Sequence, residues 1–213
     1  MSLRDLKRQR TRQAIVDAAV ELFERDGYEQ TTVADIAAAA EIGTRTFFGY
    51  FATKEEVLFP ETDLRRRAAI EAIAERGPDD GPAEVLLRTL RRVGDDSDDI
   101  SGRRAALRLR LIREVPAVRG RALQIQMDVQ LDIARHLAAA FPDELDTVTA
   151  AALVGAFVGA VTGALQAALE VVPVPSPVEV QVVVEHATGV ALRPWLTHAR
   201  ETAAKGVETA SGA

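Results

Sequence analysis

Apolar residues recur every three or four positions along most of the chain, which is the spacing of helices that bury one face. The first such stripe predicts a helix over residues 7–26, ended by Gly27, and consists of Ile15, Ala18, Ala19, Leu22 and Phe23. Similar stripes predict helices over residues 64–76, 83–93, 103–115, 116–140, 147–171 and 178–200. Alternation with a period of two is nearly absent, so the sequence predicts an all-α fold.

Residues 32–54 predict two short helices separated by a tight turn. Thr32 and Asp35 have the spacing of a capping box, in which each side chain bonds to the backbone near the other residue. Glu41-Ile42-Gly43 interrupts the helical pattern, and Gly43 is expected to give the turn its backbone freedom. Two helices joined in this way form a helix-turn-helix, whose second helix enters the DNA major groove.

The second of these helices is expected to begin at Thr44. Phe47 and Phe51 are four residues apart and are therefore expected to face inward together. The residues left to point elsewhere are Thr44, Arg45, Phe48 and Gly49. A further capping box over Thr53 to Glu56 predicts that a third helix starts almost at once, and Pro60 is expected to break it.

Charge is distributed unevenly along the chain. The formal net charge of −6 argues against a protein that binds nucleic acid over its whole surface. Residues 1–12 nevertheless carry a basic excess, because Asp5 is outnumbered by Arg4, Lys7, Arg8, Arg10 and Arg12. Beside a helix-turn-helix, we interpret this segment as a disordered arm that follows DNA phosphates. The alternative is a solvated start of the first helix.

The sequence gives little support to an enzyme. It contains no cysteine, and its first residues lack the apolar core of a signal peptide, which suits a cytoplasmic protein. Its histidines are far apart, and they are accompanied by no glycine-rich phosphate loop or nucleophile motif. We therefore expect no catalytic residues, no cofactor and no metal site. A small helical enzyme or a helical adaptor without DNA binding is the alternative.

Residues 8–59 resemble the DNA-binding domain of the tetracycline-repressor (TetR) family of bacterial transcription regulators. The elements that carry this resemblance occur in a fixed order over some fifty residues, which makes the signal specific. They are Ala-Ala-Val-Glu-Leu-Phe at 18–23, Gly27-Tyr28, Thr31-Thr32-Val33, Thr46-Phe-Phe-Gly-Tyr-Phe51 and Lys54-Glu55-Glu56.

The resemblance implies a homodimeric regulator, a repressor that binds a palindromic operator and is released by a small molecule. Arg45 is the expected base contact, because its guanidinium can hold guanine O6 and N7 together. Further DNA contacts are expected at Thr32, Val33, Thr44, Thr46, Gly49, Tyr50 and Lys54. The chain departs from many relatives at Phe48, where they have tyrosine, and at Gly49, where others have a longer side chain. Both departures remove a contact, so DNA shape would carry more of the specificity.

The resemblance also divides the chain. It implies a DNA-binding helix-turn-helix domain with the basic arm over residues 1–59, a larger helical domain for ligand binding and dimerisation over 60–200, and a flexible tail over 201–213. The segment 107–119 resembles a branch of the family with acyl-coenzyme-A-like ligands. Arg108 and Arg110 are the expected partners of an anionic ligand, and the alternative is that they are solvated or paired with acidic residues.

Small residues recur every fourth position between residues 147 and 169, a stretch without charge. Gly155, Gly159 and Gly163 form the centre of this stripe and would let another backbone approach closely. In the TetR family the last two long helices form a four-helix bundle between subunits, and the glycines fit that interface. A membrane-spanning helix and a tightly packed core within one chain are the alternatives.

Overall fold

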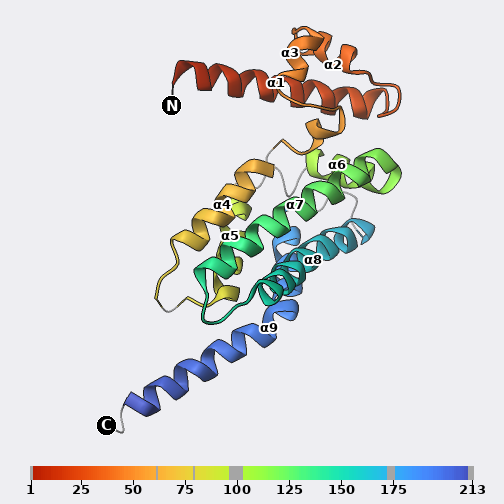
Figure 1. The fold of residues 1–213 in the computed structure, drawn as a ribbon. Coiled ribbons are helices and arrows are strands. Elements are labelled where there is room, and N and C mark those ends of the chain that lie inside the picture. Colours follow the sequence, from red (N-terminus) through yellow and green to blue (C-terminus); the bar gives the residue numbers. More distant parts are fainter. Residues whose placement is uncertain (1, 61, 79, 96–102, 172–175, 211–213) are drawn as a thin grey trace. The chain divides into compact units, whose positions relative to one another are not determined.

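The structure is a computed structural model that describes residues 2–60, 62–78, 80–95, 103–171 and 176–210. Throughout these residues the regular elements are helices, which confirms the predicted all-α fold. In chain order they are α1 (Leu3–Arg25), α2 (Val33–Ala39), α3 (Thr44–Phe48), the 3-10 helix η1 (Glu55–Leu58), α4 (Thr62–Ala74), α5 (Pro82–Asp95), α6 (Arg103–Glu114), α7 (Pro116–Ala140), α8 (Thr147–Val171) and α9 (Pro177–Ala210) (Figure 1).

The chain forms two compact units, and the first is not continuous in sequence. Unit 1 comprises Met1–Thr62 together with Arg103–Ile125, and unit 2 comprises Asp63–Gly102 with Gln126–Ala213. The division at Thr62 lies near the boundary expected at residue 59. The structure, however, adds α6 and the first part of α7 to the unit that contains the expected helix-turn-helix.

The core of unit 1 explains this addition. Phe23, Phe47 and Phe51 are buried at its centre beside the stripe of α1 that the sequence predicts. Four apolar residues from α6 and the start of α7 complete the same core, namely Leu107, Leu111, Val115 and Val118. Burying such side chains contributes roughly 1.5–3 kcal/mol each, so this part of the chain is integral to the stability of unit 1.

Unit 2 is a helical layer built around α8 and α9, which have the most extensive contact of any helix pair in the described chain. Its core combines residues from α4, α5, α7, α8 and α9, among them Ile73, Leu86, Leu137, Leu153 and Leu192. The bounds of α8 coincide with the predicted 147–171. Helix α9 continues to Ala210, so the expected tail is helical through that residue; residues 211–213 lie outside the described chain.

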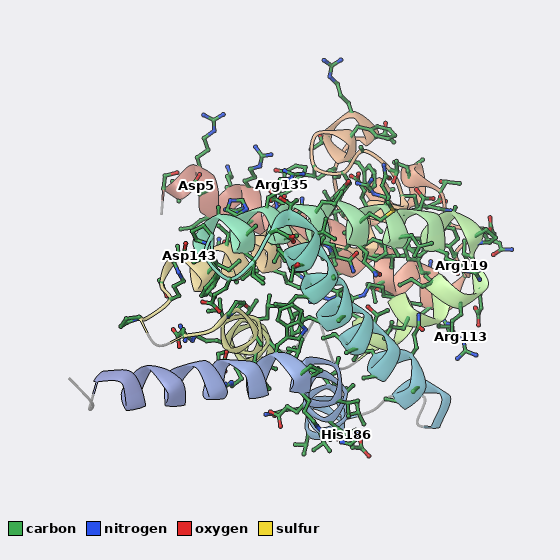
Figure 2. The ribbon with its side chains drawn as sticks, turned by 60° about the horizontal axis from the view of Figure 1, so that its bottom comes forward. Asp5, Arg113, Arg119, Arg135, Asp143 and His186 are labelled. Carbon is green, nitrogen blue, oxygen red and sulfur yellow. The ribbon has the colours of Figure 1, made fainter. Side chains whose placement is uncertain are left out.

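The corner between α6 and α7 is fixed by Arg119. Its Nε donates to the carbonyl oxygen of Ile112 at 3.0 Å, and an Nη donates to that of Arg113. These carbonyls belong to the last turn of α6, where they have no partner within the helix. Pro116 begins α7, a position that suits its fixed φ and missing N–H. Figure 2 shows Arg113 and Arg119 close together at this corner.

Two local expectations are wrong. The basic segment is not a disordered arm, because Ser2 and Asp5 form a capping box and α1 is helical from Leu3. The capping box expected at Thr53 does not form either. The Glu56 carboxylate instead accepts from the Ala52 N–H at 2.6 Å, and only η1 follows. Pro60 then separates η1 from α4 as predicted.

Candidate nucleic-acid interface

The first helix of the motif begins with the predicted capping box. The Asp35 N–H donates to the Thr32 hydroxyl at 3.2 Å, and the Asp35 carboxylate accepts from the Thr32 N–H at 2.8 Å and from its hydroxyl at 2.6 Å. These bonds lower the pKa of Asp35. Both side chains are exposed, whereas Val33 packs against the core. The Thr32 hydroxyl is therefore engaged in capping, and it can still accept a bond from outside.

The turn after α2 is a Schellman motif with an unusual residue at its centre. Ile42 N–H donates to the Ala37 carbonyl at 2.9 Å, and Glu41 N–H donates to that of Ala38 at 3.1 Å. This motif requires a left-handed residue, and it is Glu41, with φ 54°, rather than the expected Gly43. Gly43 has φ −81° and serves as the N-cap of α3. The prediction about Gly43 is therefore wrong, because the left-handed position comes two residues earlier.

Helix α3 is anchored from one side only. Phe47 and Phe51 are buried as predicted, with ring centres 5.9 Å apart. The other residues of α3 and its C-cap are exposed, namely Thr44, Arg45, Thr46, Phe48 and Gly49. Two phenyl anchors thus fix the rotation of α3 about its axis and present a face with hydroxyls, one guanidinium and one aromatic ring to the outside.

Arg12 holds the segment that follows α3. Its guanidinium donates to the carbonyl oxygens of Tyr50 at 3.2 Å and Pro60 at 3.0 Å, and it lies 4.3 Å from the centre of the Phe51 ring. Arg12 was expected to belong to the basic arm, and its role in holding this segment was not predicted. The signal for it is its position one turn before Ile15, on the face of α1 that enters the core.

Lys54 is bonded within the unit. Its Nζ donates to the carbonyl oxygens of Tyr28 at 2.8 Å and Thr31 at 3.0 Å. The Tyr28 hydroxyl donates to Glu55. Burial, followed by this bond, raises the pKa of Tyr28 far above its usual value. Burial opposes ionisation of Glu55, yet the bond from Tyr28 and further hydrogen bonds hold its pKa below the usual value. Lys54 therefore ties η1 to the turn after α1, whatever else it contacts.

A second arginine reaches the loop after α3 from α7. Arg121 pairs with Glu56 at 2.5 Å, and the same carboxylate accepts from the Ala52 N–H. Arg103 of α6 pairs with Glu24 of α1 in addition. Arg121 and Glu56 are 65 residues apart, so no local pattern in the sequence could have joined them. The position of α3 thus depends on α1, η1 and α7 together.

The expected ligand residues do not point the same way. Arg108 is buried, with 7% of its surface exposed, whereas Arg110 is exposed. Residues two apart on a helix lie on nearly opposite faces. Both belong to α6 and hence to unit 1.

The glycine stripe of α8 faces away from the core of its own unit. A Cβ placed at Gly155, Gly159 or Gly163 would meet nothing within 4 Å in the described part of the chain. The opposite face buries Ala150, Leu153, Val154 and Phe157. The intrachain core considered as an alternative does not account for the stripe. Residues Thr147–Ala168 have a mean hydropathy of 2.0, and only 22% of this apolar window is buried; by length and composition alone it could cross a membrane.

Comparison with known proteins gives a consistent picture. Residues 15–59 match the sequence profile described as bacterial regulatory proteins of the tetR family. The chain is 33% identical over 149 residues to the HTH-type transcriptional regulator TcmR of Streptomyces glaucescens, which covers 68% of this chain and 66% of TcmR. The match thus spans just under two thirds of that relative. A second regulator, HbdR of Aromatoleum sp. (strain CIB), is 40% identical over 48 residues, 22% of this chain and 21% of HbdR.

Solved structures share the fold. A TetR-family transcriptional regulator from Syntrophomonas wolfei superposes with a TM-score of 0.62 at 19% identity, covering 87% of this chain and 96% of that one. The Thermus thermophilus repressor FadR, solved in complex with lauroyl-CoA, superposes with a TM-score of 0.55 at 21% identity, covering 85% and 93%. At these identities the likeness concerns the fold.

Proposed function

Because this chain belongs to the TetR family of bacterial regulatory proteins, we propose that it is a ligand-responsive transcriptional repressor in the cytoplasm. It binds a palindromic operator as a homodimer and is released by a small molecule. The observation that carries the proposal is the arrangement of α3, whose buried Phe47 and Phe51 leave a polar face exposed on a short, rigidly held helix.

Base reading is assigned to that face. Arg45 is exposed in the first turn of α3, where a recognition helix contacts base edges, and its planar guanidinium matches guanine. Thr44 and Thr46 flank it with hydroxyls that can bond to bases or phosphates. Thr32, Val33, Tyr50 and Lys54 are assigned to the phosphates on either side. For Lys54 this requires that the ammonium keep one donor for DNA while bonding two carbonyls, which its three N–H groups allow.

Dimerisation is assigned to α8, with α9 beside it. The exposed stripe of Gly155, Gly159 and Gly163 is free of charge and lets a second backbone come close. Val178, Val182 and Val190 are exposed on α9 and add apolar surface to the same unit. Exposed apolar surface of this kind marks an interaction site, so a second copy is the partner we propose.

The effector is proposed to be an anionic, largely apolar compound of the acyl-coenzyme-A type, the class that the FadR complex contains. Arg108 and Arg110 are the candidate partners of its charge. Of the two, buried Arg108 is the stronger, because a charge–charge bond gains strength where water is excluded. An effector can release DNA only if it prefers a conformation in which the two recognition helices are spaced wrongly for the operator.

The proposal is tested by selecting binding sites from a pool of random duplexes with the full-length protein. We expect enrichment of an inverted repeat whose half-sites are about one helical turn or more apart. Addition of long-chain acyl-coenzyme A should then release the selected duplex. A pool that stays random after several rounds would overturn the DNA-binding function, whereas release by a different compound would overturn only the effector class.

A further inference from the structure

The first part of α1 is a helix that buries nothing in its own unit. All residues from Ser2 to Arg10 are exposed, and the first fully buried side chain is that of Ile15. The Ser2–Asp5 capping box starts the helix, and its buried second half continues it. Isolated helices of this length are marginal in water, so the exposed part owes its order to these two ends rather than to packing.

The basic residues of this exposed part lie on distinct faces. Residues four apart on a helix share a face, so Arg4, Arg8 and Arg12 form one row along α1. Arg10, two residues after Arg8, points to the opposite side, whereas Lys7, three residues after Arg4, borders the row. Arg8 and Arg10 carry the same charge but have different surroundings, because the row with Arg12 points towards the segment that follows α3.

Two contacts place this row beside the recognition helix. Arg12 donates to the Tyr50 carbonyl, and the Arg8 guanidinium lies 5.7 Å from the centre of the Tyr50 ring. Tyr50 directly follows Gly49, the C-cap of α3. Arg8 and Arg4 therefore continue, one turn at a time, a line of positive charge that starts at the end of α3.

We propose that the Arg4–Arg8 edge of α1 binds the DNA backbone next to the bases that α3 reads. The inference rests on the proposed function and extends the interface beyond the helix-turn-helix. Phosphate is the fitting partner because the edge offers guanidinium groups, in a chain whose net charge is −6. Asp5 lies three residues before Arg8, but its carboxylate is bonded to the N–H and hydroxyl of Ser2 in the capping box. Such contacts are independent of base sequence and release counterions.

The test compares two single variants that each remove one positive charge from α1. Arg8→Gln alters the proposed edge, and Arg10→Gln is the matched control on the opposite face. Binding of the full-length proteins to a labelled duplex is followed by fluorescence anisotropy at several salt concentrations between about 50 and 200 mM. Circular dichroism verifies that all proteins have equal helix content.

We expect the slope of log K against log salt to fall by roughly 0.9 per lost contact for the edge variant, on selected and scrambled duplexes alike. The control should keep the wild-type slope. Shortening the duplex flanks should lower the slope of the wild type but not that of the edge variant. Equal slopes for the edge variant and the wild type would overturn this inference and leave the proposed function standing. Failure of the wild type to bind any duplex would overturn both.

Discussion

The ammonium of Lys54 lies 3.9 Å from the centre of the Tyr28 ring and donates to the carbonyl oxygen of the same residue at 2.8 Å. A third contact, to the Thr31 carbonyl, closes the turn between α1 and α2. Lys54, which is expected to bind a DNA phosphate, thus also joins η1 to this turn. Loss of its charge would therefore lower the stability of the fold as well as the affinity for DNA.

Lys54→Met should therefore lower the free energy of unfolding. Hydrogen bonds to a charged group contribute about 1.5–3 kcal/mol and a partly exposed cation–π contact about 0.5–1 kcal/mol, so we expect a loss of about 2 kcal/mol. Urea unfolding followed by circular dichroism measures it. Lys7→Met, which changes an exposed lysine of α1, is the control and should be neutral. If the urea midpoints of Lys54→Met and Lys7→Met were equal, the Lys54 ammonium would make no stabilising contact in the folded protein.

Arg45→Ala should weaken binding to the selected operator by about 1–3 kcal/mol and relax the preference at one base position. The physical reason is the loss of a bidentate contact that distinguishes guanine from the other bases. Arg25→Ala removes an exposed arginine at the end of α1 and serves as the control. Competition titrations with single-base operator variants measure both effects. Undiminished affinity and selectivity of Arg45→Ala would refute the assignment of α3 as the reading helix.

Gly159→Leu should convert the dimer into monomers, because a leucine on the stripe would keep two α8 helices apart. Within one chain the substitution meets open space, so the monomer should remain folded. Gly120→Leu is the matched control, since Gly120 is an exposed helical glycine of α7 with equally open surroundings. Light scattering coupled to size exclusion gives the mass of each. A dimeric Gly159→Leu protein would place the subunit interface elsewhere.

Glu41→Gly should stabilise the protein by a few tenths of a kcal/mol to about 1 kcal/mol. The left-handed conformation costs a residue with a side chain roughly 1–2 kcal/mol, and the greater freedom of glycine in the unfolded chain offsets part of the gain. The same change at Glu29, a turn residue whose φ is not positive, should be destabilising. Thermal unfolding of the two variants beside the wild type tests the sign. A destabilised Glu41→Gly protein would show that the Glu41 side chain makes a stabilising contact.

The local features of the interface could be predicted from the sequence because they depend on residues three or four apart. The capping box of Thr32 and Asp35 and the inward pair Phe47 and Phe51 are of this kind, and both are confirmed. The left-handed residue could not be predicted, because glycine is the usual choice there and the chain uses Glu41 instead.

The tertiary contacts that hold the interface could not be predicted from the sequence pattern, because it does not give their partners. In the sequence, Arg12 is one of several positive charges in a basic segment. Its hydrogen bonds to the Tyr50 and Pro60 carbonyls, 38 and 48 residues away, are evident only in the fold. The pair of Arg121 and Glu56 depends on α6 and α7 returning to the N-terminal helices. For the same reason α6, which was expected in the ligand-binding domain, contributes to the core of unit 1.

The shared core of unit 1 has a consequence for modularity. A fragment ending at Thr62 would contain every residue assigned to DNA contact, yet it would expose the surface that Leu107, Leu111, Val115 and Val118 cover in the intact chain. Operator specificity therefore cannot be transferred to another regulator by exchanging the N-terminal segment alone. A chimera that exchanges the DNA-binding unit must therefore include the α6–α7 corner of the same protein. For the same reason, we expect the sequences of this corner and of the recognition helix to have diverged together.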